Sequence, residues 1–503
     1  MIKVFNIILV VLLFLCLNYV TLFAADRYTL SVACGDVQAD EATIWVRGTF
    51  AASVTIEYAN NNLFNNSKEA NDLTITDFDD YTGKITLKDL PLGQKIFYRA
   101  YFKNLKSPYN IEGPIMGVCK TPGTSLEPVK FLWSSGIGTD GFGINGPWGG
   151  MKIFKTMSNR QADFSILAGN IISADVPLES SKKIDGKRVW YNVVTADKQR
   201  VAESISDFWG HYRYNLLDEA FRKFIANNAI YAIWNDHEFY NNCYPDEVIN
   251  DARYKEKSIN VLVANGKKAF FDYMPIKINS YAPNRIYKNI KYGPFLELFL
   301  LDMRSYRGAS NENTQEQKNA FTSLLGDAQL SWLKNSLLES KALWKIIVLP
   351  QPISFIIEDG KAAFDGIANM DGPPRGREIE FSEILTYIKR NNVKNIIFLS
   401  GGLNFAAALS YDPSLARGSD FNPFYEFIAG PLNGATDVLK KVDNTFGPKI
   451  LFSKSADNNS NKLSPLDGFQ FFGEVNIERN GKLTVTFRDI IGNAIYSKSL
   501  EAQ

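Results

Sequence analysis

The chain has 503 residues, of which 45% are apolar and 22% are charged, and its 55 basic and 54 acidic side chains leave a net charge of +1. A nucleic-acid-binding protein usually carries an excess or a stripe of basic residues, which this balance does not provide. The composition also excludes a disordered chain or a coiled coil. We therefore expect a globular protein, and the length favours two domains.

Residues 1–25 have the pattern of an export signal. Lys3 precedes an apolar run over residues 4–23, and the small residues Ala24 and Ala25 follow it. A cationic start, an apolar stretch and small residues at its end are typical of a cleaved signal peptide. We expect an exported protein, periplasmic or secreted. An uncleaved anchor is the alternative, because the run approaches the ~20 residues that span a bilayer. After signal cleavage no segment is apolar enough to cross a membrane.

Residues 26–122 are predicted to form an N-terminal β-sandwich of the immunoglobulin or fibronectin kind. Short runs rich in β-branched and aromatic residues alternate there with turn residues, at 28–33, 41–47, 53–58, 81–87, 95–102 and 115–120. A Pro- and Gly-containing linker follows at 121–128. Cys34 and Cys119 fall in the first and last of these strands, so they are predicted to form a disulfide, with two buried thiols as the alternative. Cys243 is then expected to be free.

The second domain, residues 129–503, is predicted to be an α/β domain. Amphipathic helices are expected at 149–159, 201–228, 327–340 and 378–391, each followed by an apolar strand. Four apolar strands run directly into glycine and small polar residues, at 131–136, 166–173, 230–238 and 396–404. Open α/β sheets place their sites beyond the carboxyl ends of such strands, so the four loops should converge on one cleft. A hairpin with an Asn-Gly turn is predicted at 469–488.

The motif WNDHE at 234–238 is the strongest candidate for chemistry. Only two histidines occur in the chain, and His237 lies between Asp236 and Glu238 at the end of an apolar strand. An aspartate can ligate a hard cation while a neighbouring imidazole donates to a substrate oxygen. A structural role, with a capping Asp236 and a buried His237, is the alternative for the motif taken by itself.

Further motifs make the chain resemble the PhoD-type alkaline phosphatases, a family of metal-dependent phosphoesterases. The resemblance covers nearly the whole chain after residue 25. It is carried by SVACGD and ATIWVR (31–36, 42–47), WNDHEFYNNCYP (234–245), LDMRSYRG (301–308), LGDAQLSWL (325–333), GPPRGREIE (372–380) and FYEFIAGPL (424–432). It implies a β-sandwich followed by a metallophosphatase-like α/β domain, with two packed sheets and flanking helices.

The resemblance also implies a binuclear metal site, yet this chain departs from the family at most ligand positions. The family's first ligand, Cys or Asp, corresponds to the stretch WSSG at 133–136, which offers only hydroxyls. Its G-D-x-x-Y motif corresponds to GNIIS at 169–173, with Asn170 for the bridging acid and Ser173 for the tyrosine. Its closing G-D-x-H motif corresponds to GGLN at 401–404, with Gly402 and Asn404 for the acid and the histidine.

These replacements predict that the binuclear centre is absent. Two dications about 4 Å apart repel by roughly 16 kcal/mol at an effective dielectric of 20, and a neutral carboxamide cannot offset this as a bridging carboxylate does. We expect at most one weakly bound Ca²⁺ or Mg²⁺, with Asp236, Asn170, Asn404 and Asp175 as its candidate ligands. Asp175 is the best candidate for a compensating acid, and a loop-capping role is its alternative.

The resemblance assigns the remaining roles at the site. His237 and Asp236 are the catalytic candidates, with His237 as a phosphate-binding proton donor. Arg304 and Asn241 are the candidate substrate-binding residues, because a guanidinium recognises phosphate through two hydrogen bonds. The alternative is that the arginines of this region, Arg304, Arg307, Arg375 and Arg377, pair with Asp302, Glu378 or Glu380 to hold loops.

Two functions follow for this exported chain. The first is a divergent phosphomonoester or phosphodiester hydrolase that is weakly active or inactive, that is, a pseudoenzyme. The second is a non-catalytic envelope protein that uses the remnant cleft to bind an anionic small molecule or a protein partner.

Overall fold

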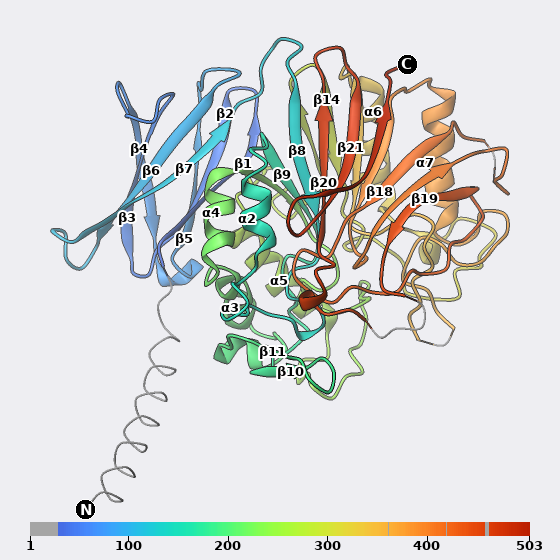
Figure 1. Cartoon of the computed structure of the whole chain (residues 1–503), viewed down its shortest axis with the longest axis horizontal. Coiled ribbons are helices and arrows are strands. Elements are labelled where there is room, and N and C mark those ends of the chain that lie inside the picture. Colours follow the sequence, from blue (N-terminus) through green and yellow to red (C-terminus); the bar gives the residue numbers. More distant parts are fainter. Residues whose placement is uncertain (1–28, 361, 419, 458–461) are drawn as a thin grey trace, which may run out of the picture.

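Two large β-sheets that face each other form the body of the molecule. The structure is a computed structural model that describes residues 29–360, 362–418, 420–457 and 462–503, so the predicted export signal lies outside the described residues. Figure 1 shows the N-terminal strands, coloured blue, at one end and the central strands of the sheets fanning out beside them.

The first sheet has nine strands in the order β22-β21-β20-β8-β9-β12-β1-β2-β5. Its central strands β8, β9 and β12 run parallel to one another, as predicted from their apolar sequences. The strands are β1 (Ser31–Gln38), β2 (Glu41–Arg47), β5 (Thr82–Leu87), β8 (Val129–Ser134), β9 (Phe164–Ala168), β12 (Ala229–Ile233), β20 (Phe471–Ile477), β21 (Leu483–Asp489) and β22 (Ala494–Leu500). The hairpin predicted at 469–488 is confirmed as β20 and β21, and β22 extends it.

The second sheet has seven strands in the order β13-β14-β15-β16-β18-β17-β19. Strands β14, β15, β16 and β18 are parallel neighbours. The strands are β13 (Lys288–Tyr292), β14 (Leu296–Leu300), β15 (Trp344–Leu349), β16 (Ile396–Ser400), β17 (Ala406–Tyr411), β18 (Phe424–Ile428) and β19 (Pro448–Lys454).

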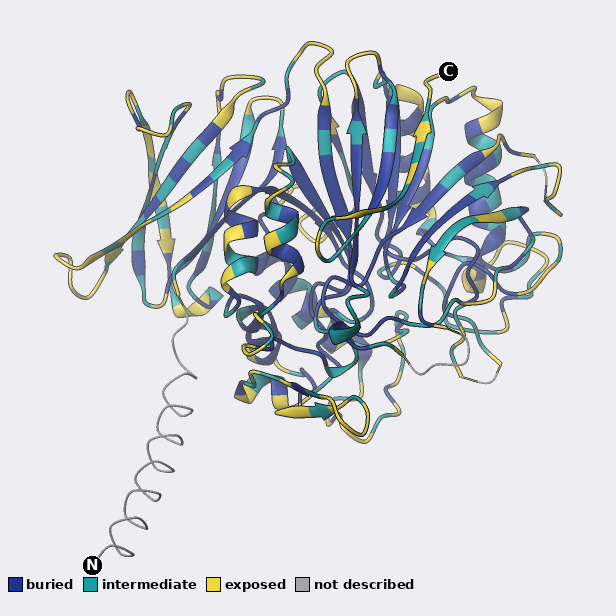
Figure 2. Ribbon diagram, viewed as in Figure 1, coloured by how far each residue is buried: buried dark blue, intermediate teal, exposed yellow. Residues whose placement is uncertain are grey.

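Side-chain alternation along the strands separates the layers. In β12, Tyr231 and Ile233 point into the core between the two sheets, whereas Ile230 and Ala232 point toward the helices on the outer face. Every residue of β12 is buried because both faces of the sheet are covered. The predicted two-sheet α/β domain with flanking helices is therefore present, and Figure 2 shows its central strands buried along their length.

Helices cover the outer faces of both sheets. Those over the first sheet are α2 (Ile153–Ser158), α3 (Ile205–Asn215), α4 (Glu219–Asn227) and α5 (Ile259–Tyr273), and those over the second are α6 (Gly326–Glu339) and α7 (Glu378–Arg390). The single helix expected at 201–228 is two helices, α3 and α4. Asp218 is the N-cap of α4, since its side chain accepts the Phe221 N–H at 2.9 Å. Helix α5 was not predicted.

Short elements complete the described fold. Strands β10 (Ser181–Lys183) and β11 (Val189–Tyr191) form a separate hairpin below the helices in Figure 1. The 3₁₀ turns are η1 (Asp77–Asp79), η2 (Thr139–Gly141), η3 (Ala196–Gln199), η4 (Ala320–Thr322) and η5 (Pro465–Asp467).

The N-terminal β-sandwich is joined to the nine-stranded sheet. Its outer sheet consists of β4 (Lys68–Ile75), β3 (Ala52–Ala59), β6 (Lys95–Asn104) and β7 (Ile111–Lys120). Its inner sheet, β1, β2 and β5, continues the larger sheet because β1 pairs in parallel with β12. A sandwich forms as predicted. The hydrogen bonds between β1 and β12 nevertheless join its inner sheet to the second domain, beyond the predicted linker.

Cys34 and Cys119 are free thiols in the structure, so the predicted disulfide is not present. Cys34 in β1 and Cys119 in β7 contact each other across the sandwich and are 0% and 4% exposed, which matches the alternative of two buried thiols. Cys243 is free and buried, as predicted.

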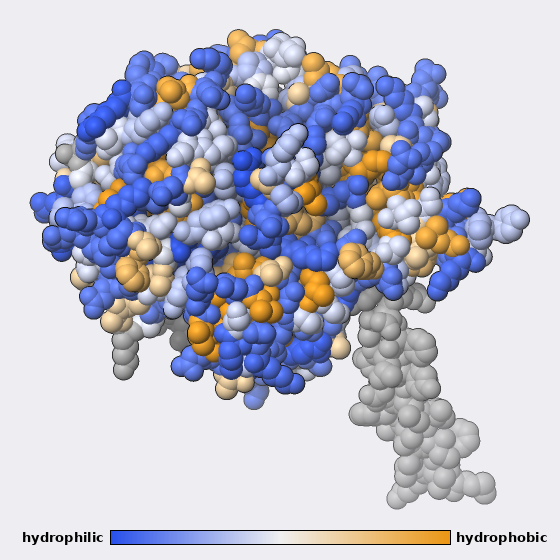
Figure 3. Space-filling model, turned by 180° about the vertical axis from the view of Figure 1, so that it is seen from behind, coloured by the Kyte–Doolittle hydropathy of each residue, from blue (hydrophilic) through white to orange (hydrophobic). Residues whose placement is uncertain are grey.

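The described surface is largely polar on the face opposite to Figure 1. Figure 3 shows hydrophilic residues over most of that face, with apolar residues scattered between them. Within the part of the chain that the structure describes, no helix is long and apolar enough to cross a membrane.

Candidate active site

The four loops that follow β8, β9, β12 and β16 converge, which confirms the prediction from strand direction. After β8, Ser135 Oγ accepts the Gly402 N–H of the β16 loop at 3.1 Å. The Ile137 N–H donates to Asn170 O of the β9 loop at 2.8 Å. A side chain added at Gly136 would place its Cβ 3.0 Å from Asn404 Oδ1. Strands from both large sheets therefore contribute to one site.

Glu238 fastens two of these loops together. Its carboxylate accepts the backbone N–H groups of Asn170 at 3.0 Å, Ile171 at 2.5 Å and Asn235 at 2.7 Å. Burial, together with the charge of Asp236, raises the pKa of Glu238 to about 7 against the effect of these donors. Glu238 is fully buried, so its oxygens hold the β9 and β12 loops rather than a ligand.

Asp236 is bound within its own turn and to an arginine. Its Oδ1 accepts the His237 N–H and its Oδ2 accepts the Asn242 N–H, both at 3.0 Å. Arg304 Nη2 lies 3.3 Å from Asp236 Oδ2, so the charge of this carboxylate is already balanced. The turn-capping alternative is thus part of what Asp236 does.

His237 and Asp175 form the ion pair of the site. His237 Nδ1 lies 2.8 and 2.9 Å from the two carboxylate oxygens of Asp175, which also accepts the Asn241 N–H at 3.0 Å. Burial alone would lower the pKa of His237, but the carboxylates of Asp175 and Asp236 outweigh it and raise the pKa to about 10. His237 is therefore an imidazolium at neutral pH. Its side chain is 23% exposed, so it can meet a solute.

The structure corrects the substrate-binding role expected of Arg304. The guanidinium is 0% exposed, with two hydrogen bonds to Asp365 at 2.7 and 2.8 Å and one to Asn235 Oδ1 at 2.8 Å. A guanidinium enclosed by protein acceptors has no face left for phosphate. The alternative of a structural role is favoured, although the partners are Asp365 and Asp236 rather than the acids expected.

The other arginines of this region also bind protein groups. Arg307 binds the carboxylate and the carbonyl of Asp365 at 2.6 Å, and Arg377 binds the carbonyls of Phe364 and Gly366. Arg375 pairs with Glu316 at 3.0 Å. No short-range pattern pointed to Asp365, because its contacts with Arg307 and Arg304 join positions 58 and 61 residues apart.

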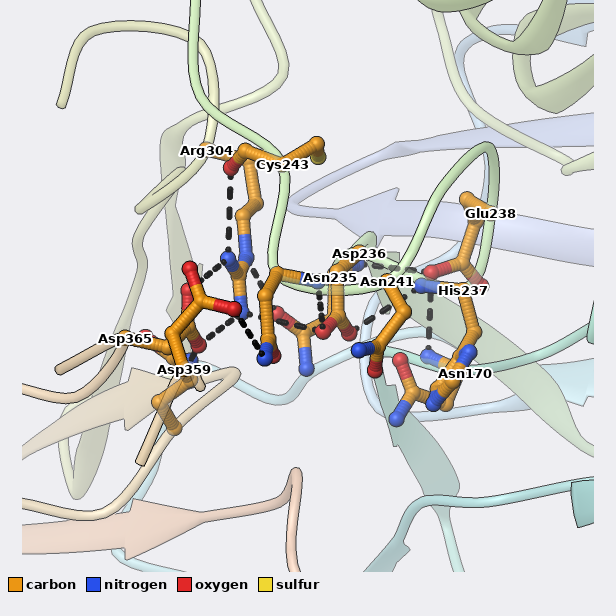
Figure 4. Close-up of polar contacts among 12 residues, drawn as sticks. Asn170, Asn235, Asp236, His237, Glu238, Asn241, Cys243, Arg304, Asp359 and Asp365 are labelled. Carbon is orange, nitrogen blue, oxygen red and sulfur yellow. Dashed lines mark hydrogen bonds and ion pairs between the residues drawn. The ribbon is translucent and has the colours of Figure 1, made fainter. Parts of the chain in front are cut away.

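Of the three asparagines named from the sequence, Asn170 and Asn241 lie beside the ion pair, whereas Asn404 lies beside Gly136 and Asp437. Figure 4 shows Asn170, Asn241 and His237 close together, with Arg304 on the other side of Asp236. Asn170 is 4% exposed, adopts a left-handed φ of 53°, and its Oδ1 has no hydrogen-bond partner among the described residues. The side chain of Asn404 donates weakly to Asp437 Oδ2 at 3.4 Å, and Asn241 is exposed.

The donors at this site do not fit a binuclear metal centre. The positions that the sequence resemblance matched to four metal ligands hold Asn170, Ser173, Gly402 and Asn404, and Ser173 Oγ is 3.4 Å from the carbonyl of Ile137. The acids that remain are bound to His237, Arg304 and backbone N–H groups. In the described ranges no three His, Cys, Asp or Glu side chains are placed to hold one ion. The Oδ1 of Asn170, which has no hydrogen-bond partner among the described residues, is a neutral oxygen of the kind that hard cations accept as a ligand.

The fold and the site define the class of protein. Two mixed sheets pack face to face, and residues 236–238, the DHE motif, follow the central strand β12. This is the architecture of a metallophosphatase-like protein. Family models extend this to the sequence: the model described as PhoD-like phosphatase matches residues 131–487, and that of the PhoD-like phosphatase N-terminal domain matches residues 19–122. The chain belongs to the PhoD-like phosphatase family.

Individual relatives agree with this assignment. Alkaline phosphatase D of Bacillus subtilis (strain 168) is 29% identical over 227 residues, which is 42% of this chain and 37% of that protein. The alignment thus spans well under half of the relative. The solved structure titled "Structure of PhoD" superposes with a TM-score of 0.70 at 17% identity, over 94% of this chain and 92% of that one. A purple acid phosphatase, PPD1 from yellow lupin (Lupinus luteus) seeds, has a TM-score of 0.55 at 10% identity, over 93% and 73% of the two chains. These structural likenesses concern the fold.

Proposed function

We propose that this protein is an exported, divergent PhoD-family protein that holds at most one Ca²⁺ or Mg²⁺ and hydrolyses phosphoesters weakly or not at all. The observation that carries the proposal is the charge state of the site. Each acid that remains there already has a partner: Asp236 has Arg304, Asp175 has His237, and Glu238 has three backbone donors. Binding a second dication would require these pairs to break, which costs several kcal/mol for buried charges.

A second function, binding of an anion without catalysis, is favoured by His237. The imidazolium is held by Asp175 and partly exposed, and its neighbours Asn170 and Asn241 are neutral. A fixed cation among neutral polar groups attracts a phosphoester or another small oxyanion without needing a metal. The ligand would be bound at the place where the family binds its substrate, and released unchanged.

Metal analysis paired with a phosphoesterase assay tests the proposal. We expect at most one divalent cation per purified chain and hydrolysis of p-nitrophenyl phosphate and bis-p-nitrophenyl phosphate near background. The double variant N170D/N404H restores an acid and an imidazole at two ligand positions and should bind more metal. Asn110→Asp, an exposed substitution in the sandwich, is the matched control and should change nothing. Two tightly bound metals and rapid turnover in the unmodified protein would overturn the proposal.

Phosphate binding separates the two functions. Titration of inorganic phosphate against the unmodified protein and against His237→Ala should show binding that the variant loses, if the site is a binding site. Hydrolysis without metal dependence, or phosphate binding that is unaffected by His237→Ala, would argue against the second function.

A further inference from the structure

A cavity of about 420 Å³ lies apart from the candidate active site, beside the end of β1. One wall is formed by Asp36 and Gln38, and the other by residues 276–281, 285 and 287–289, which follow α5 and include the start of β13. Strand β1 is parallel to β12, and Lys288 pairs with Leu300 at the carboxyl end of β14. The cavity therefore opens at the same edge of the sheets as the candidate site, where α/β proteins bind ligands.

The charged groups of the cavity leave one cation without an acid. Lys288 binds both oxygens of Asp36, at 2.5 and 2.6 Å, and Lys277 pairs with Glu41. Arg285 is partly buried, and within the described ranges no carboxylate lies within ion-pair distance of it. A guanidinium without an acid partner is an open fork of donors for an oxyanion.

Aromatic rings hold this guanidinium in place. Arg285 lies 5.1 Å above the ring of Tyr287, which packs in turn against Trp332 at 4.9 Å and Tyr306 at 6.0 Å between ring centroids. A cation stacked on a buried ring keeps its hydrogen-bonding edge free. Tyr281 on the cavity wall is 98% exposed, so its ring is available to cover a flat ligand.

We propose that this cavity is a second ligand site that binds a small oxyanion carrying a planar ring, with Arg285 holding the oxyanion and Tyr281 stacking on the ring. The oxyanion can be a phosphate-type group or a carboxylate, since both match the geometry of a guanidinium. The site is independent of the proposed phosphatase-family function, because its residues belong to other segments than the DHE motif and the loops around it.

Calorimetric titration with phenylphosphonate and with benzoate tests the site, since neither compound can be hydrolysed as a phosphoester. We expect one of them to bind with a dissociation constant of about 1 mM or tighter, and the neutral benzyl alcohol to bind much more weakly. Arg285→Gln should weaken binding at least tenfold, in line with the loss of a charge-assisted hydrogen bond. The exposed Arg479→Gln is the matched control and should bind as the unmodified protein does. Comparing the two compounds identifies the preferred oxyanion.

Two further variants keep the test decisive. Tyr281→Ala changes a fully exposed side chain, so it should leave the fold intact and still weaken binding severalfold. His237→Ala should leave binding unchanged, because His237 belongs to the other site. The proposal is overturned if neither compound binds at millimolar concentration, if Arg285→Gln and Tyr281→Ala bind normally, or if His237→Ala abolishes binding.

Discussion

Asp175→Asn should lower the pKa of His237, because it removes the charge that does most to raise this pKa. The carboxylate of Asp175 contacts His237 Nδ1 at 2.8 Å and is the strongest of the groups that raise this pKa to about 10. An amide of the same size keeps a hydrogen bond but loses the charge. Burial then acts with less opposition and pulls the pKa back toward or below the ordinary value of about 6.5.

The same shift predicts how stability depends on pH. A rise from 6.5 to about 10 corresponds to an interaction of about 5 kcal/mol that favours the folded state. Because the folded pKa is the higher one, this contribution is fully present below about pH 6.5 and is lost as the pH rises through 10. Asp175→Asn should therefore unfold more easily at pH 6 and lose less stability between pH 7 and 10 than the unmodified protein.

Nuclear magnetic resonance of the histidine rings measures this directly. The chain has two histidines, and burial and the neighbouring Lys198 keep the pKa of His211 far below 6.5, so only His237 should titrate in the alkaline range. Asp185→Asn, at an exposed ion pair, serves as the control. A wild-type His237 that titrates near pH 6.5, or an unchanged pKa in Asp175→Asn, would refute the reasoning.

Two further substitutions test the residues that hold the loops of the candidate site in place. Arg304→Met should destabilise the protein by about 3–5 kcal/mol in chemical denaturation, because it leaves Asp365 buried with fewer partners, whereas the exposed Arg479→Met should have little effect. An equal midpoint for the two variants would contradict the internal role of Arg304. Gly402→Ala should cost at least ~2 kcal/mol, since Gly402 has a φ of 77° and a Cβ would lie 2.3 Å from the carbonyl oxygen of Pro350. Gly186→Ala, in open space, is its control, and equal melting temperatures for the pair would show that the loop yields easily.

The sequence predicted those strands and helices whose hydrophobic pattern lies within a short stretch of residues. The apolar strands β8, β9, β12 and β16 are buried on both faces, and their sequences show it. Strand β4 was missed because its residues are mostly exposed and polar, without the alternation of a half-buried strand. The pairing of β1 with β12 joins residues almost 200 positions apart, and no short-range pattern signals such a contact.

For the candidate site too, some features could be predicted from the sequence and others could not. Its position was predicted from strand direction and from the motif at 236–238, and the predicted loops do contact one another there. The partners of its charged groups did not follow, because Asp365 reaches Arg304 and Arg307 only through the tertiary fold. An arginine in a family block looks the same in the sequence whether it faces solvent or a buried carboxylate. Burial, which decided the question for Arg304, has to be read from the structure.

The backbone of the β9 and β16 loops limits which acidic side chains the site could carry. Asn170 has a left-handed φ of 53° that aspartate also tolerates, so Asn170→Asp needs no change in the chain path. Gly402 differs, because any side chain there meets the carbonyl of Pro350 in a conformation that favours glycine. Carboxylates at both positions would require the loop to move away from β15. A carboxylate can therefore be introduced at position 170 by substitution alone, whereas a carboxylate at position 402 demands a different backbone.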